Sequence, residues 1–242
     1  MQRHLGLDFM GNAIFRFIAK YYPTERIDRN RVLSALWRIL FYLVRPSKPI
    51  LMRTRNYRLI ADPARNNLTR TIIRRGYWEP LVTELFVKTL TPGAMIIDAG
   101  ANFGHYALTA ANYVEPEGLV FAFEPHRKTF RQLSANCDLL ETANLKLILA
   151  GLGERNCEMR LYSDRENPGG HSFFEWNVRS AEGKGENAAI FSLDSFLEKN
   201  APGRRLDIFK LDVQGFEMKA FIGAQKSINE FHPAIFCEIT PS

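Results

Sequence analysis

The sequence predicts an α/β protein: a doubly wound, mostly parallel β-sheet with helices on both faces, preceded by a helical amino-terminal extension. The pattern of apolar runs and the length of the chain favour this fold. In the second half of the chain, short apolar runs without polar alternation are separated by helical segments, as in strands buried on both faces. Right-handed crossovers between such strands give a doubly wound sheet. The 242 residues allow one large domain with an extension.

The elements follow this pattern in order along the chain. Residues 10–45 predict two helices separated near Pro23, and residues 48–62 alternate around a polar turn and predict a hairpin. Residues 77–90 predict a helix that Pro92 ends. The buried strands are then expected at 94–102, 119–124, 145–151, 206–212 and 234–239, with helices at 104–114, 126–140 and 215–231.

An irregular stretch at 152–205 interrupts this alternation. It contains the short run 159–163, a loop with Pro168, and a segment at 189–200 that predicts a strand passing into a helix. Asp194 in that segment has the position of a helix N-cap. We expect the stretch to form a small hairpin at the rim of the active site.

Positive charge is concentrated at the front of the chain. Residues 1–80 contain 16 Lys and Arg against 5 Asp and Glu, whereas the rest contains 16 against 21, for a net charge of +6. Arg31, Arg38 and Arg45 recur every seven residues, opposite a leucine face. Residues 31–45 therefore predict an amphipathic helix that is too short to span a bilayer. Two partners for it are open: an anionic membrane surface, or the protein's own core or a second subunit.

The composition excludes several classes of protein. With 46% hydrophobic and 24% charged residues, the chain is an ordinary globular protein rather than a disordered one. Three cysteines without paired spacing argue against a disulfide framework, so we expect a reduced, cytoplasmic protein. The sequence shows no secretory signal, no nucleic-acid-binding motif and no cluster with metal-ligand spacing. We therefore expect neither a nucleic-acid partner nor a metal.

A cofactor site is expected where the first buried strand ends. Residues 98–104 read DAGANFG, a DxGxNxG pattern whose glycines permit a tight turn before a helix. The helix offers free N–H groups to an anion. Glu124 ends the second strand, at the position from which a carboxylate grips ribose hydroxyls. These features assign cofactor binding to Asp98, Gly100, Ala101, Asn102, Gly104 and Glu124.

Two cofactors use this layout. A nicotinamide dinucleotide would make the protein an NAD-linked dehydrogenase, but its pyrophosphate requires a turn with nothing acidic beside it. S-adenosylmethionine carries a sulfonium and an ammonium group, which the nearby Asp98 would favour, and one carboxylate, which the helix N-terminus would favour. The acidic residue in front of the turn therefore favours S-adenosylmethionine.

These residues also carry a family resemblance. The chain resembles the FkbM family of S-adenosylmethionine-dependent methyltransferases in the successive blocks IIDAGANFGHYAL, FAFEPH, FSLDSFL, IFKLDVQGFEMKAFIGA and PAIFCEI, and in the preceding GYWEP. The resemblance covers roughly residues 76–240, which divides the chain into an extension at 1–75 and a methyltransferase domain at 76–242. It implies a Rossmann-like class I methyltransferase fold and O-methylation of a sugar or natural product.

A narrower resemblance concerns the acceptor. The compact length and arginine-rich front are similar to the NoeI-like nodulation methyltransferases, which implies the 2-hydroxyl of a fucose on a lipo-oligosaccharide as the acceptor. Such a glycolipid would suit a basic front that lies peripherally on the inner face of the membrane. Methyltransferase sheets commonly continue beyond a fifth strand, so 234–239 is expected to be an edge. Residues 1–75 or the second subunit of a homodimer would cover it, unless the sequence is truncated.

Two residues are candidates for the base that removes a proton from the acceptor hydroxyl. Asp212 ends the fourth strand, next to the first, so its carboxylate is expected to face the transferred methyl group. His171 follows two glycines in the rim loop and titrates near neutral pH. Structural interpretations stay open: a helix cap for Asp212 and a solvated loop residue for His171. Phe173, Phe174 and Trp176 would either stack against a sugar or belong to the core.

Overall fold

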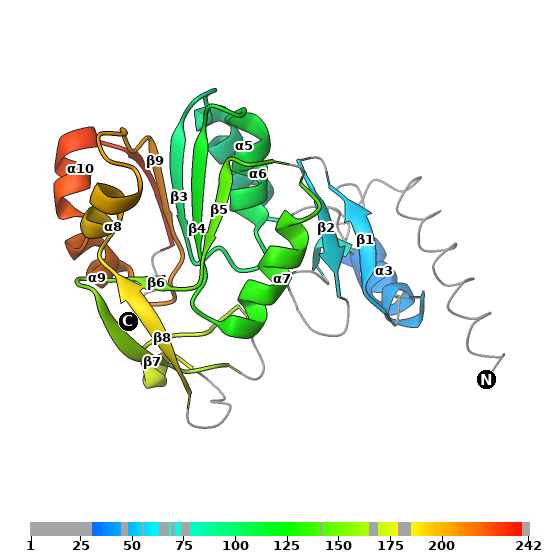
Figure 1. Ribbon diagram of the computed structural model, residues 1–242. Helices are drawn as coiled ribbons and strands as arrows, with labels where there is room; N and C mark the ends of the chain where they lie inside the picture. Colours follow the sequence, from blue (N-terminus) through cyan, green and yellow to red (C-terminus); the bar gives the residue numbers. More distant parts are fainter. Residues whose placement is uncertain are drawn as a thin grey trace. The chain divides into compact units, whose positions relative to one another are not determined.

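The computed structural model describes residues 31–44, 48–54, 56–62, 68, 71–73, 78–140, 142–164, 169–178 and 185–238. The chain divides into two compact units, residues 1–80 and 81–242 (Figure 1). The helix expected before residue 31 lies outside the described residues. The domain boundary expected after residue 75 stays a prediction, because residues 74–77 also lie outside them.

The first unit contains a helix and a hairpin. Helix α3 (Arg31–Val44) forms where apolar positions recur at helical spacing. Strands β1 (Ile50–Arg53) and β2 (Arg58–Ala61) pair antiparallel, which confirms the hairpin expected at 48–62. The Thr54 hydroxyl donates to the Tyr57 carbonyl oxygen (3.0 Å) and closes the turn.

The amphipathic face of α3 can be described only in part. Val32, Leu36 and Ile39 on this helix are more than half exposed. The side chains of Arg31 and Arg38, and the whole of residue 45, lie outside the described residues. None of the helices in the described part of the chain has the length and hydrophobicity needed to cross a membrane.

The second unit is built on a five-stranded parallel sheet, which confirms the predicted fold class. Its strand order is β10-β9-β3-β4-β5, so the chain starts in the middle, moves to one edge and then returns to the other. The switch point therefore lies between β3 and β9, which is where ligands bind in open α/β sheets. The strands are β3 (Met95–Ala99), β4 (Leu119–Phe123), β5 (Leu145–Ile148), β9 (Ile208–Leu211) and β10 (Ala234–Cys237).

Helices cover both faces of this sheet (Figure 1). One group of three helices covers one face, and a second group of three covers the other. On the second face an aromatic layer packs against the strands, where Phe196 contacts Phe121 and Phe123 edge to face. The first group is α5 (Pro80–Thr89), α6 (His105–Tyr113) and α7 (Arg127–Cys137), and the second is α8 (Leu193–Asn200), α9 (Glu217–Ile222) and α10 (Gln225–Phe231).

The single helix expected at 215–231 is wrong in one respect. It is broken into α9 and α10 at Gly223, whose backbone lies so close to the Gly153 carbonyl that a Cβ atom would overlap it. The Gly223 carbonyl oxygen also accepts a hydrogen bond from the Asp194 backbone N–H (2.9 Å). Packing between these segments therefore ends a helix that the sequence pattern would have continued.

The irregular stretch forms a small three-stranded sheet beside the carboxyl ends of the main strands (Figure 1). Its strands are β6 (Gly151–Leu152), β7 (Cys157–Leu161) and β8 (Glu186–Phe191). The short 3-10 helix η1 (Glu175–Asn177) lies in the connection between β7 and β8. The antiparallel pair β7 and β8 is the expected hairpin, and β8 runs directly into α8 as predicted. The small sheet adds a wall to the edge where the predicted site residues converge.

Candidate active site

A pocket lies at the carboxyl ends of the main strands, at the switch point between β3 and β9. It brings together six residues that the sequence singled out, from the turn after β3, the ends of β4 and β9, and the rim loop. Ala101 and Gly104 belong to the same turn, and Asp98 to the end of β3, but these three residues do not line the pocket. The lining residues are Gly100, Asn102, Glu124, Pro125, Thr129, Leu161, Gly169, His171, Phe173, Asp212, Val213 and Gln214.

The glycine turn is shaped by the approach of two strand ends. The Asp212 N–H donates to the Ala99 carbonyl oxygen (3.1 Å), which holds the end of β9 against the end of β3. Gly100 has a φ of +76°, and a Cβ atom there would overlap the Asp212 carbonyl oxygen. Gly104, with a φ of +102°, is the N-cap of α6. A side chain at Gly100 would therefore push the two strand ends apart.

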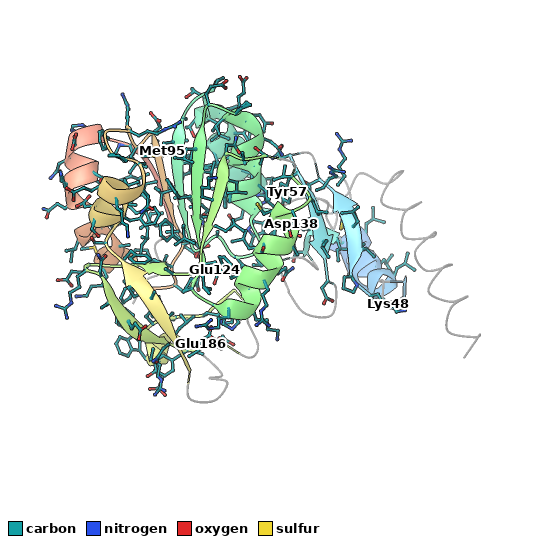
Figure 2. All side chains as sticks on the ribbon, viewed as in Figure 1. Lys48, Tyr57, Met95, Glu124, Asp138 and Glu186 are labelled. Atoms are coloured by element: carbon teal, nitrogen blue, oxygen red, sulfur yellow. The ribbon has the colours of Figure 1, made fainter. Side chains whose placement is uncertain are left out.

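Glu124 is fixed by backbone donors on both of its oxygens. Oε2 accepts from the Asn102 N–H (3.0 Å), and Oε1 accepts from the His126 N–H (2.9 Å). Figure 2 shows Glu124 at the carboxyl end of the sheet and Met95 at the opposite end. Burial raises the pKa of Glu124 to about 7, despite these two hydrogen bonds. The carboxylate is thus held rigidly on the pocket wall, with lone pairs left to accept hydroxyl groups.

Asn102 carries a second polar group that a ligand could use. Its φ of +52° places it in the left-handed region, which asparagine tolerates better than most residues. Its buried Oδ1 atom has no hydrogen-bond partner among the described residues. A buried acceptor without a partner is costly, so the site is better satisfied when a donor occupies the pocket. The residues present therefore fit a cofactor that carries ribose hydroxyl or ammonium donors.

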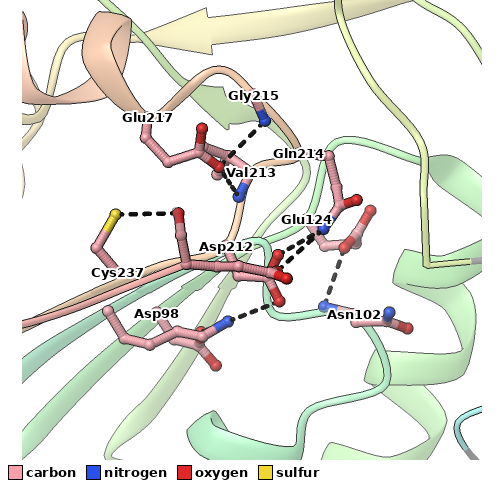
Figure 3. A network of polar contacts seen from close by, with 11 residues as sticks. Asp98, Asn102, Glu124, Asp212, Val213, Gln214, Gly215, Glu217 and Cys237 are labelled. Atoms are coloured by element: carbon pink, nitrogen blue, oxygen red, sulfur yellow. Dashed lines mark hydrogen bonds and ion pairs between the residues drawn. The ribbon is translucent and has the colours of Figure 1, made fainter. Parts of the chain in front are cut away.

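A buried charge cluster lies behind the pocket (Figure 3). Lys210, on β9, places its Nζ atom 3.4 Å from Asp98 Oδ1 and 3.7 Å from Asp212 Oδ2. Burial raises the pKa of Asp98, and Lys210 offsets part of that effect. Lys210 was not predicted as a site residue, although it is a charged residue inside the apolar run 206–212. Asp98 was expected to lie against the cofactor, whereas the Asp98 carboxylate is buried against Lys210.

Asp212 is the exposed end of this cluster. Its side chain is 36% exposed, and Oδ1 accepts a hydrogen bond from the Gln214 side-chain amide (2.7 Å). Burial alone would raise the pKa of Asp212, but Lys210 and the hydrogen bonds outweigh it, so the pKa is lowered. The backbone N–H groups of Val213 and Gly215 donate to Glu217 instead (3.2 and 3.1 Å). These N–H groups of the turn before α9 are thus bound by Glu217, and the Asp212 carboxylate faces the pocket.

His171 lines the pocket from the rim loop, but both of its ring nitrogens are engaged. Nδ1 accepts from the Asp164 backbone N–H (3.2 Å), and Nε2 lies 3.5 Å from the Thr129 hydroxyl. The ring packs on His126 with centroids 3.8 Å apart. Burial and the neighbouring His126 lower the pKa of His171 to about 3. The imidazole is therefore neutral and held in place, rather than a solvated loop side chain.

The three aromatic residues of the rim loop lie in different environments. Phe173 is buried and lines the pocket, whereas Trp176 is 79% exposed and stacks on Phe174 with centroids 4.5 Å apart. The loop is tied to the end of β9, because the Ser172 hydroxyl donates to the Gln214 carbonyl oxygen (2.8 Å). The core interpretation therefore fits Phe173, and an open stacking surface remains at Trp176.

The family model of the methyltransferase FkbM domain matches residues 98–242 of this chain. The chain belongs to the FkbM methyltransferase family. The family decides between the two cofactors considered above: the methyl donor is S-adenosylmethionine, and the dehydrogenase alternative is set aside. No metal-binding group of three or more His, Cys, Asp or Glu side chains occurs among the described residues.

Solved structures of methyltransferases resemble this member of the FkbM family in part. The methyltransferase FkbM from Methylobacillus flagellatus is 14% identical (TM-score 0.41), covering 68% of this chain and 40% of that one. An rRNA methylase from Streptococcus thermophilus is 16% identical (TM-score 0.35; 62% and 63%). TYW2 from M. jannaschii in complex with AdoMet is 19% identical (TM-score 0.34; 43% and 43%). The chain thus aligns with less than two thirds of each structure, and no curated protein shows significant sequence similarity to it.

Proposed function

We propose that the protein transfers a methyl group from S-adenosylmethionine to a sugar hydroxyl, specifically the 2-hydroxyl of a fucose on a nodulation lipo-oligosaccharide. The observation that supports O-methylation is the partly exposed Asp212 carboxylate on the pocket wall. A hydroxyl must lose its proton as the methyl group is transferred, and a fixed carboxylate can accept that proton. The fucose and the lipo-oligosaccharide come from the resemblance of the sequence to NoeI-like enzymes.

The other residues of the pocket hold the donor. S-adenosylmethionine, when bound, supplies a methyl group activated by a positively charged sulfur. The two Glu124 oxygens would accept the ribose hydroxyls, and the unpartnered Asn102 Oδ1 would accept a further donor. The Gly100 backbone allows close approach of the ligand. The acidic groups at the end of β9 favour the positive charge of the donor.

The structure offers a physical reason to choose Asp212 over His171 as the base. A proton acceptor must present a free lone pair to the substrate, and each His171 ring nitrogen already faces a protein group. Asp212 is partly exposed on the same wall and stays ionised because its pKa is lowered. We therefore propose that Asp212 receives the proton, while His171 and its stack with His126 shape the pocket.

Substitution of Asp212 by asparagine tests the proposed reaction. We expect Asp212→Asn to lower kcat for methyl transfer about 100- to 10,000-fold, because the amide keeps the shape but cannot take the proton. His171→Ala should lower kcat less than Asp212→Asn does. The measurement is incorporation of methyl-labelled cofactor into fucosylated, rhamnosylated and unglycosylated lipo-oligosaccharides, with the label located by NMR. Normal turnover in Asp212→Asn, or transfer to a nitrogen or carbon atom, would refute the proposal.

The exposed stack of Trp176 on Phe174 supports a sugar as the acceptor, because the apolar face of a sugar ring packs on an aromatic face. We expect Trp176→Ala to raise KM for a fucosylated acceptor about 3- to 10-fold, with little change in kcat or in the affinity for S-adenosylhomocysteine. Tyr113→Ala, which removes another exposed aromatic ring at the far end of α6, is the control. Equal KM values in the two variants would argue against the stacking role.

We also propose that residues 31–45 bind the inner, anionic face of the membrane, in keeping with a lipid-bearing acceptor and a cytoplasmic enzyme. The support is the exposed apolar residues of α3 together with the arginines at every seventh position. Reversal of Arg31, Arg38 and Arg45 to glutamate should reduce sedimentation with phosphatidylglycerol vesicles about 100-fold. The same reversal at the exposed Lys128, Lys146 and Lys199 is the control. Equal losses in both variants would mean that the attraction is not local to the helix.

A further inference from the structure

Lys210 is a buried lysine in the middle of the central sheet. Its side chain is 8% exposed, and it lies opposite Asp98 in the register of β9 against β3. Its Nζ atom lies between the carboxylates of Asp98 and Asp212, and 5.1 Å from the centre of the Tyr106 ring. An ammonium group at such a place is costly unless each of its neighbours compensates for the lost water. Figure 3 shows the two carboxylates at the end of the sheet.

The two carboxylates differ in what they can do. Asp98 is fully buried, and neither of its oxygens has a hydrogen-bond partner of ordinary geometry among the described residues, so the Lys210 ammonium is its main compensation. Asp212 reaches the pocket and has the Gln214 amide as a second donor. Asp98 therefore serves as the buried anchor of the ammonium group, and Asp212 as its outer partner.

Other titratable groups also lie close to Asp212. Glu238 and Cys237 approach it from the end of β10, and Asp98 lies on β3; a side-chain hydrogen bond with Glu238 lowers the pKa of Asp212, as the Gln214 amide does. The Gln214 side chain contacts both Asp212 and Glu238, with Nε2 at 2.7 and 3.4 Å from their oxygens. Among the described residues, Lys210 is the cation within ion-pair distance of Asp212.

We propose that Lys210 is a positioning residue: anchored by Asp98, its ammonium group holds the Asp212 carboxylate ionised and fixed at the pocket wall. The consequence for methyl transfer rests on the proposed function of Asp212 as proton acceptor. The electrostatic coupling does not rest on it, because it follows from the distances among these three residues. Removal of the ammonium group would take away the cation that Asp98 and Asp212 share.

The coupling can be measured without any acceptor. The protein is labelled with carbon-13 at its aspartate carboxyl groups, and the Asp212 signal is assigned by its loss in Asp212→Asn. In Lys210→Met we expect the titration midpoint of Asp212 to rise by about 1–2 pH units relative to the unchanged chain. A structural role of Lys210 alone would leave this midpoint unmoved.

A second pair of variants separates the coupling from a folding defect. Lys210→Met leaves Asp98 buried without a cation and should lower Tm, whereas Asp98→Asn with Lys210→Met removes both charges and should recover most of that loss. We expect the Asp212 midpoint to be higher in the double variant than in Asp98→Asn alone. Equal midpoints in those two proteins would overturn the inference. Unaltered methyl transfer by Asp212→Asn would instead refute the proposed function and leave the measured coupling in place.

Discussion

Gly100→Ala should lose both stability and cofactor binding. The alanine would adopt a φ of +76° and place its Cβ atom on the Asp212 carbonyl oxygen. The left-handed backbone costs about 1–2 kcal/mol, and forced overpacking adds roughly 1–3 kcal/mol. Because the overlapping atom belongs to the backbone of the neighbouring strand end, relief requires β3 and β9 to separate. That movement would displace both the turn and Asp212.

The test compares Gly100→Ala with Gly203→Ala by urea denaturation and by calorimetric titration with S-adenosylhomocysteine. Gly203 has a similar φ of +71°, but nothing lies within 4 Å of a Cβ atom built there. It should therefore show the backbone cost of about 1–2 kcal/mol alone and bind the ligand normally. If Gly100→Ala behaved like this control, the close approach of the strand ends would not be a requirement of the site.

The sheet and the turn could be predicted because their sequence signals are local. Strands buried on both faces show as apolar runs, and all five appear within a few residues of where they were expected. The DxGxNxG pattern and Glu124 could be placed at one edge, because the carboxyl ends of parallel strands share it. The structure brings Gly100, Asn102 and Glu124 into one pocket.

Contacts between distant segments could not be predicted in the same way. Asp194 has the local position of an N-cap for α8, yet Ser192 caps that helix, and its side chain accepts from the Ser195 N–H. The Asp194 carboxylate instead accepts from the N–H groups of Lys226 and Ser227 at the start of α10. The sequence shows the capping residue but not which helix end packs beside it.

Lys210 was missed for a related reason. A lysine inside a buried strand is unusual, but its role depends on the strand pairing that sets it beside Asp98. Once β9 is known to lie next to β3, a lysine two residues before Asp212 must share its environment with both acids. A charged residue in a run predicted to be buried on both faces should therefore be included among the candidate site residues.

The stability of the protein without ligand should depend on pH through Glu124. Burial raises its pKa from 4.5 to about 7, so the folded state binds this proton more tightly than the unfolded state. The favourable contribution is complete below pH 4.5 and is lost as pH rises to about 7, which lowers the free energy of unfolding by about 3 kcal/mol. Glu124→Gln should remove this part of the pH dependence. Glu186→Gln, another acid that accepts a backbone N–H (2.9 Å), should leave it unchanged.

The same group should make cofactor binding depend on pH in the opposite direction. Only the ionised Glu124 can accept two ribose hydroxyls as well as the two backbone N–H groups, so S-adenosylhomocysteine should bind more tightly as pH rises to about 7 and show no further gain above it. Glu124→Gln should bind about 100-fold more weakly, because charge-assisted hydrogen bonds are lost and the new amide opposes a backbone donor. Calorimetric titration between pH 5.5 and 8.5 measures both effects. Burial of the ionised Glu124 destabilises the protein without ligand, whereas in the complex the ribose hydroxyl groups stabilise its charge by hydrogen bonding. Binding by the glutamine variant at wild-type affinity would show that this carboxylate does not hold the ribose.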